Sequence, residues 1–303
     1  MSAPDSLLVF DRTTVRRHRE RASRQWTTRN FLKDEVAGRL AERLDDVRRP
    51  FARALDLGCH GDELGRRLVA RGTEWVVRAD LALGFARAAD GPALVADEEA
   101  LPFAPASFDL VASALDLHWV NDLPGALIQI RRILRPDGLL CAALLGGASL
   151  WQLRAALTQA ESEIEGGLSA RVSPFADLRD AAGLLQRAGF ALPVADSETI
   201  DVEYPDALAL MRDLTGMGES NAIVARRRGF ARRATLLRAA EIYGERFRLP
   251  SGRLAASFEV IYLHGWSPDA TQPRPLRPGA ARARLADALG AIEHGAGERA
   301  GPA

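Results

Sequence analysis

The stretch ALDLGCHGDELG, from Ala54 to Gly65, has the residue types of a cofactor loop: an apolar strand, an acidic residue and glycines at a turn. In open α/β sheets, ligands bind beyond the carboxyl ends of the strands, and the loop after the first strand is the usual site. A dinucleotide loop would carry glycines in the order G-x-G-x-x-G, which this stretch does not match. The pattern therefore predicts a cofactor loop of another class, and the alternative is an ordinary strand-to-helix turn.

Two side chains, His60 and Asp62, stand in this loop where glycines would be expected. Glycine serves there because it reaches positive φ angles and leaves room for a ligand. His and Asp are enriched among the other residues that adopt left-handed conformations, so we predict a loop that is weakened and not abolished. The pair also reads as H-x-D, the start of an iron site, but the third ligand would have to be a histidine far away in the sequence. We predict no metal.

A β/α alternation surrounds the loop. Apolar runs predict strands at residues 53–57, 74–80, 93–97, 108–115, 139–147, 193–204 and 257–266. Apolar spacings of three to four predict helices at residues 30–47, 62–70, near 85, 121–134, 150–163, 177–188, 207–214 and 233–243. Residues 135–138, RPDG, are expected as a turn. Strands separated by helices imply a parallel α/β sheet with right-handed crossovers, which the last strands should complete.

Acidic residues end the second and third predicted strands. A carboxylate in the place of Asp80 can accept hydrogen bonds from both hydroxyls of a ribose. Its alternative role, capping the next helix, is compatible with that one. Asp97 ends the third strand in the same way.

These residues resemble class I S-adenosylmethionine-dependent methyltransferases. Asp56 and Gly58 match their acidic-x-Gly turn, and LPF…FDLVAS…LHWVNDLPGAL…RRILRPDGLL is similar to the methyltransferase type 11 group, which includes malonyl carrier-protein O-methyltransferases. The resemblance implies a seven-stranded Rossmann-like sheet with an N-terminal helical lid and C-terminal helical insertions. It also implies S-adenosyl-L-methionine as cofactor, bound by Asp56, Gly58, Cys59, Gly61, Asp80, Leu81, Asp97, Glu98 and Ala114.

A second set of motifs narrows the resemblance. EGGLSARVSPFADLRDAAGLLQRAGF and DLTGMGESNA are similar to the mitochondrial complex I assembly factors regarded as arginine hydroxylases with a methyltransferase fold. The similarity runs from about Phe10 to Ser267 and implies modification of a protein side chain, with arginine a candidate, on the iron-sulfur subunit of respiratory complex I. Methyl transfer and hydroxylation both stay open. The alternatives are a carboxyl O-methyltransferase of a small or carrier-bound acid and a non-catalytic assembly chaperone.

Polar and aromatic residues near the expected pocket are the candidates for catalysis and substrate binding. His118, after the fourth strand, is a candidate general base or a structural residue, and Asp116 either faces the pocket or caps a turn. The candidate substrate contacts are Trp26, in the lid, and Trp119, Arg171 and Ser173. The alternatives are core packing for the tryptophans and an ion pair for Arg171.

The expected domains are an N-terminal helical lid at residues 1–48 and a methyltransferase-like domain at residues 49–266. Within the latter, core motifs occupy residues 52–146 and a substrate-binding half occupies residues 147–266. A tail rich in Pro, Ala and Arg follows at residues 267–303.

Composition limits the partners. The 303 residues contain 40 basic and 40 acidic side chains, so no global field attracts nucleic acid. Arginines cluster in two places, which predicts solvated helix faces or a docking surface for an acidic protein or a membrane: Arg12, Arg16, Arg17, Arg19, Arg21 and Arg24, then Arg226, Arg227, Arg228, Arg232 and Arg233. Lys33 is the only lysine, which we attribute to genome composition.

The compartment is predicted from cysteines and apolar runs. Cys59 and Cys141 are too few for a disulfide framework and suit thiols in the cytoplasm. No apolar run reaches the roughly 18 residues of a membrane span, and the N-terminus lacks the pattern of a secretory signal. A soluble protein is expected, with peripheral membrane contact left open.

Overall fold

The structure is a computed structural model that describes residues 8–173, 178–227, 229–273 and 290. The helices are α1 Arg12–Ser23, η2 Trp26–Thr28, α2 Phe31–Asp45, α3 Glu63–Ala70, α4 Leu83–Ala88, η3 Leu117–Trp119, α5 Leu123–Ile133, α6 Trp151–Glu165, α7 Leu178–Arg187, α8 Ala207–Met217 and α9 Arg233–Arg246. The strands are β1 Arg53–Leu57, β2 Trp75–Asp80, β3 Ala93–Val95, β4 Phe108–Ala114, β5 Leu134–Leu145, β6 Ala191–Tyr204 and β7 Leu254–Trp266.

The chain divides into two compact units, Met1–Pro268 and Asp269–Ala303. All of these helices and strands belong to the first unit. Most of the predicted tail, and the start of the predicted helix at 177, lie outside the described residues. In the part of the chain that is described, each helix is too short or too polar to span a bilayer.

One sheet of seven strands, in the order β3-β2-β1-β4-β5-β7-β6, confirms the predicted architecture. β1 pairs in parallel with both β2 and β4, so the winding direction of the chain reverses between them. β4 and β5 are also parallel, whereas β7 runs antiparallel between β5 and β6. The carboxyl ends of β1 and β4 therefore flank the switch point where α/β sheets bind ligands.

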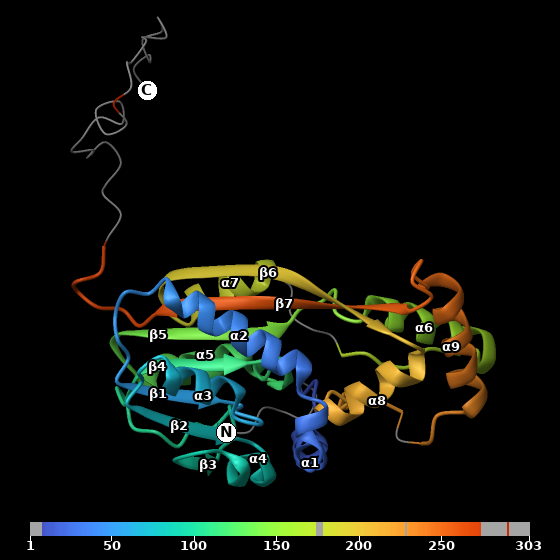
Figure 1. The fold of residues 1–303 in the computed structure, drawn as a ribbon, viewed down its shortest axis with the longest axis horizontal. Coiled ribbons are helices and arrows are strands. Elements are labelled where there is room, and N and C mark those ends of the chain that lie inside the picture. The colour runs from blue at the N-terminus through green and yellow to red at the C-terminus, as the bar shows by residue number, and fades with distance from the viewer. Residues whose placement is uncertain (1–7, 174–177, 228, 274–289, 291–303) are drawn as a thin grey trace, which may run out of the picture. The chain divides into compact units, whose positions relative to one another are not determined.

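Helices cover both faces of the sheet (Figure 1). Buried side chains of α2 and α3 share one core with those of α6, α8 and α9, while α5 and α7 pack on the opposite face. Along β4, Leu110 belongs to the first core and its neighbour Val111 to the second. Burial on both faces explains why the central strands read as continuous apolar runs.

One local prediction is wrong. Residues 135–138, expected as a turn, are part of β5. The pairing of β4 with β5 shifts register between Phe108 and Leu110, and Asp137 adopts a φ of 59°. This irregularity in the ladder accommodates the residues that favour a turn.

The N-terminal helix α1 lies near α4 and α8 (Figure 1). Asp11 caps the helix by accepting a hydrogen bond from the Thr14 N–H at 3.1 Å. A small apolar cluster, separate from the two main cores, attaches the helix to the rest of the fold: Phe10, Val15, Leu81, Trp119, Ala222 and Ile223. Ala22, near the end of the same helix, belongs to the first main core, so α1 is attached at two places.

Candidate functional site

The loop after β1 has the backbone of a glycine turn. Gly58, His60 and Asp62 have φ angles of 70°, 47° and 68°. A Cβ atom on Gly58 would lie 2.1 Å from Cγ of Asp116, so this position requires glycine. His60 and Asp62 adopt left-handed conformations, which confirms that the two replacements leave the turn in place.

Neighbouring side chains hold the two replacements. Asp62 accepts a hydrogen bond from Arg78 Nε at 2.8 Å, and both side chains are buried. The His60 ring stacks on Trp26 with ring centroids 5.0 Å apart. A Cβ on Gly61 would lie 2.2 Å from the Trp26 ring, so this second glycine allows the stacking. These contacts engage both side chains of the H-x-D pair, His60 and Asp62. The described residues contain no group of three His, Cys, Asp or Glu side chains suited to a metal.

Asp80 lies at the centre of the site. Its Oδ2 accepts a hydrogen bond from the His60 N–H at 3.1 Å, and its Oδ1 accepts one from the Ala82 N–H at 2.8 Å. The N-cap of α4 is Ala82, with no side-chain cap, so the alternative role of Asp80 as the helix cap is wrong, and its ribose role stays a prediction. A third donor, Arg19 Nη2, lies 2.6 Å from Oδ2.

Two arginines of the N-terminal cluster point into the site, so the prediction of a solvated helix face is wrong for them. Arg19 is 2% exposed and pairs with both Asp80 and Asp116. Arg12 pairs with Asp97 at 2.7 Å and with Glu98. The reason is the row of carboxylates beneath α1, which the helix neutralises with its buried face. Arg16, Arg17, Arg21 and Arg24 are exposed, as expected.

Two further residues of the loop are fully buried. Burial raises the pKa of Asp56 to about 7, although the charge of Lys33 lowers it. Burial also raises the pKa of Cys59 well above its ordinary value, so this residue is a protonated thiol. Cys59 and Cys141 are both free, as predicted.

The cofactor implied by the sequence, S-adenosylmethionine, fits the chemistry of this edge but not the space beside the loop. Asp80, Asp97 and Glu98 supply acceptors for its hydroxyl and amino groups. The glycine turn after β1 allows the backbone to approach a ligand closely. The cavity beside the loop, however, measures only about 10 Å³, room for about one water molecule. It is lined by Trp26, Leu32, Lys33, His60, Leu115, Met217 and Glu219. Cofactor contact with Asp80 requires the Arg19 guanidinium to move away.

The two predicted catalytic residues are buried and engaged. His118 Nε2 lies 3.1 Å from a carboxylate oxygen of Glu219, and Asp116 pairs with Arg19. Glu219, which follows α8, lines the cavity. Sequence reasoning missed Glu219, although it belongs to the motif DLTGMGESNA that we used for the resemblance. Arg12, Arg19 and Lys33 were missed as well.

The remaining predicted residues are divided among several environments. Leu81 and Trp119 pack in the cluster that attaches α1, and the Ala114 carbonyl accepts a hydrogen bond from Lys33. Arg171 Nε donates to Glu161 at 2.5 Å, and Ser173 is buried. The ion pair is the alternative that we considered for Arg171. The substrate and cofactor roles assigned from sequence stay predictions.

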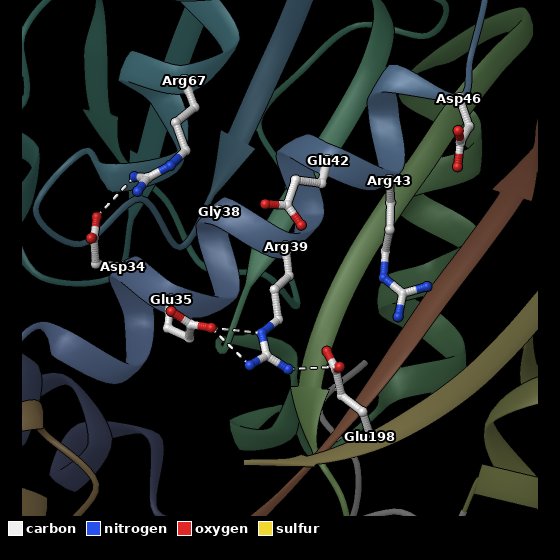
Figure 2. A pocket seen from close by; sticks show the side chains of 9 residues that line it. All are labelled: Asp34, Glu35, Gly38, Arg39, Glu42, Arg43, Asp46, Arg67 and Glu198. Atoms are coloured by element: carbon white, nitrogen blue, oxygen red, sulfur yellow. Dashed lines mark hydrogen bonds and ion pairs between the residues drawn. The ribbon is translucent and has the colours of Figure 1, made fainter.

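A larger groove of about 580 Å³ lies along α2, between Arg67 of α3 and Glu198 of β6 (Figure 2). Its charges largely pair with one another: Arg39 contacts Glu35 and Glu198, and Arg67 contacts Asp34. We therefore assign no site to this groove.

Comparisons with known proteins agree on the class of domain. Residues 55–142 match a methyltransferase domain, which supports S-adenosylmethionine as the cofactor. The chain is 40% identical to the mitochondrial arginine-hydroxylase NDUFAF5 of Danio rerio over 293 residues, 94% of this chain and 91% of that protein. The Homo sapiens protein is 41% identical over 300 residues, 97% and 86% of the two chains. A malonyl-[acyl-carrier protein] O-methyltransferase of Methylovorus sp. (strain MP688) is 36% identical over 282 residues, 88% and 93%.

Solved structures share the fold. The YcgJ protein of Bacillus subtilis superimposes with a TM-score of 0.53 at 13% identity, over 78% of this chain and 99% of that one. A methyltransferase-like protein of Bacillus halodurans gives a TM-score of 0.52 at 13% identity, over 78% and 100%. This likeness confirms the predicted class I methyltransferase fold.

Proposed function

This chain belongs to the family of the arginine-hydroxylase NDUFAF5, and we propose that it binds S-adenosylmethionine and modifies an arginine side chain of a protein. The observation that carries the proposal is the buried carboxylate of Asp80, which ends β2 beside the turn at Gly58. The ribose would bind to Asp80, and Asp97 with Glu98 would receive the adenine amino group. When bound, S-adenosylmethionine supplies an electrophilic methyl group on a sulfonium centre.

Glu219 supports a cationic substrate. Its carboxylate lines the cavity together with Trp26, and His118 Nε2 holds it at 3.1 Å. A carboxylate and an aromatic ring are the two groups that bind a guanidinium best, through paired hydrogen bonds and cation–π attraction. In this proposal Glu219 orients the arginine, and His118 orients Glu219.

The finer proposal concerns the partner. The motifs at residues 165–190 and 213–222 resemble those of complex I assembly factors, which supports the iron-sulfur subunit of complex I as the protein substrate. We propose a cytoplasmic location, which suits the two free cysteines.

Mass spectrometry of that subunit tests the function. The subunit is isolated from cells lacking this chain, and from the same cells complemented with wild type, Glu219→Gln or Glu42→Gln. Glu42 is an exposed glutamate on α2 and serves as the matched control (Figure 2). We expect an arginine carrying an added methyl or hydroxyl group with wild type and Glu42→Gln, reduced at least about tenfold with Glu219→Gln.

Two other results would contradict the proposal. An identical subunit with and without the chain, together with lost complex I assembly, would favour the non-catalytic chaperone. Methylation of malonyl carrier protein by the purified chain would favour the carboxyl O-methyltransferase, whose support is the 36% identity to the Methylovorus protein.

A further inference from the structure

The only lysine of this chain is buried beside the cofactor loop. Lys33 lies on α2 and is 3% exposed. Lysine is almost never buried to this extent unless its charge is paired. A genome that favours arginine explains why other lysines are rare, but it does not explain why the remaining one lies here. The sequence-based attribution to genome composition is therefore insufficient.

The Lys33 amine contacts three polar atoms at the switch point of the sheet. Its Nζ donates to the Gly58 carbonyl at 2.7 Å and to the Ala114 carbonyl, and it lies 2.8 Å from Nδ1 of His60. An ammonium group has three N–H donors, so these contacts match its full capacity. Gly58 follows β1 and Ala114 ends β4, and the amine therefore bridges the two strands that flank the site.

The charge of Lys33 also helps to keep the His60 ring neutral. Burial, with the nearby charges of Arg19 and Lys33, lowers the pKa of His60 well below its ordinary value, so the ring is neutral. Nδ1 also lies 2.7 Å from the Gly58 carbonyl oxygen, so it accepts from Lys33 when the ring proton is on Nε2 and donates to Gly58 when the proton is on Nδ1. Lys33 and the Gly58 carbonyl thus both hold the orientation of the ring that stacks on Trp26.

Several charges face Lys33. Burial lowers its pKa, Asp56, Glu63 and Asp80 raise it, and Arg19 lowers it. The neighbouring Glu219 lines the same cavity. Burial has the largest effect, so the pKa of Lys33 lies below its ordinary value, while the three nearby carboxylates and the carbonyls of Gly58 and Ala114 favour the charged amine.

We infer that Lys33 is a positioning residue of the cofactor loop, which acts through His60 to hold the left-handed backbone that a glycine would adopt unaided. The observation behind this is the φ of 47° at His60, in a loop position where glycine is expected. The consequence of this inference, an effect on cofactor binding, rests on the proposed function. Its structural part can be tested in the free protein.

Nuclear magnetic resonance of the free protein tests the contact directly. Labelling with 13Cε-lysine gives one lysine signal, because the chain has one lysine. We expect this signal to titrate below the ordinary lysine value of about 10.4, and to change in shift and midpoint in His60→Gly. His264→Gln, a change of another histidine on β7, serves as the control and should leave the signal in place. A lysine signal that titrates at the ordinary value, with a shift and midpoint that do not change in His60→Gly, would overturn the inference.

Calorimetry with S-adenosylhomocysteine tests the consequence. Lys33→Met should weaken binding about tenfold with His60 present but less than about twofold in the His60→Gly background, because glycine needs no support. An equal loss in both backgrounds, or no loss, would contradict positioning through His60. If the wild type binds neither S-adenosylhomocysteine nor S-adenosylmethionine, the proposed function fails and the resonance experiment alone decides the inference. That experiment also decides it if Lys33→Met does not fold.

Discussion

The guanidinium of Arg19 donates a hydrogen bond to Asp80 across 2.6 Å, and both side chains are buried. Asp80 is the carboxylate to which the ribose of a cofactor would bind. The Asp80 carboxylate therefore accepts hydrogen bonds either from Arg19 of α1 or from the ribose of the cofactor. Because breaking a buried ion pair costs several kcal/mol, opening of α1 should limit the affinity of this site for its cofactor.

Asp62→Gly should destabilise the protein, even though its φ of 68° suits glycine. The change leaves the buried Arg78 without the carboxylate that it contacts at 2.8 Å, which should cost about 3 kcal/mol. Asp62→Asn keeps an acceptor for Arg78 and should lose less. Urea denaturation measures both free energies of unfolding. Equal stability of Asp62→Gly and wild type would show that the ion pair contributes nothing.

Arg171→Ala should lower stability by about 2 kcal/mol, because Glu161, with a side chain only 4% exposed, loses its charged partner and keeps only its hydrogen bonds with Ser169. Arg24→Ala, an exposed change, is the control and should leave the unfolding free energy within about 0.5 kcal/mol of wild type. Thermal and urea denaturation give the comparison. Unchanged stability combined with lost capture of the complex I subunit would instead support the substrate contact that the sequence suggests.

Stability should depend on pH through Asp56. Burial raises its pKa from 3.8 to about 7 in the folded protein, with Lys33 opposing and Asp62 adding to the rise. The folded state thus holds the proton more tightly than the unfolded chain. This contribution is complete below the unfolded value and is lost as pH rises to about 7.

The advantage of wild type over Asp56→Asn should therefore shrink between pH 4 and pH 7, by at most about 1.4 kcal/mol per pH unit. Urea denaturation at several pH values measures it. A difference that stays constant over this range would show that Asp56 is ionised throughout.

The sequence predicted the strands, the loop and the position of Asp80 at the end of β2 because those features are local. An apolar run, a following acidic residue and a glycine turn are contiguous in the chain, and strand ends meet at one edge of any parallel sheet. Burial on both faces of the sheet also made the central strands easy to locate.

The partners across that edge are not local, which is why they could not be predicted. Arg19 lies 61 residues from Asp80 and 97 from Asp116 in the sequence. An arginine in a basic helix is usually solvated, and only the position of α1 over a row of carboxylates reverses this. For Lys33 a signal existed, since it is the only lysine, but its contacts with the Gly58 and Ala114 carbonyls become visible only when β1 and β4 are adjacent.

Calorimetric titration of S-adenosylhomocysteine into wild type, Arg19→Met and Arg16→Met tests the shared use of Asp80 most directly. Arg16 is exposed on the same helix and is the matched control, and near-ultraviolet circular dichroism verifies that each variant is folded. We predict binding at least about tenfold tighter for Arg19→Met than for wild type, and unchanged for Arg16→Met, because the ligand no longer has to displace a buried guanidinium. Equal or weaker binding by a folded Arg19→Met would contradict competition between Arg19 and the cofactor.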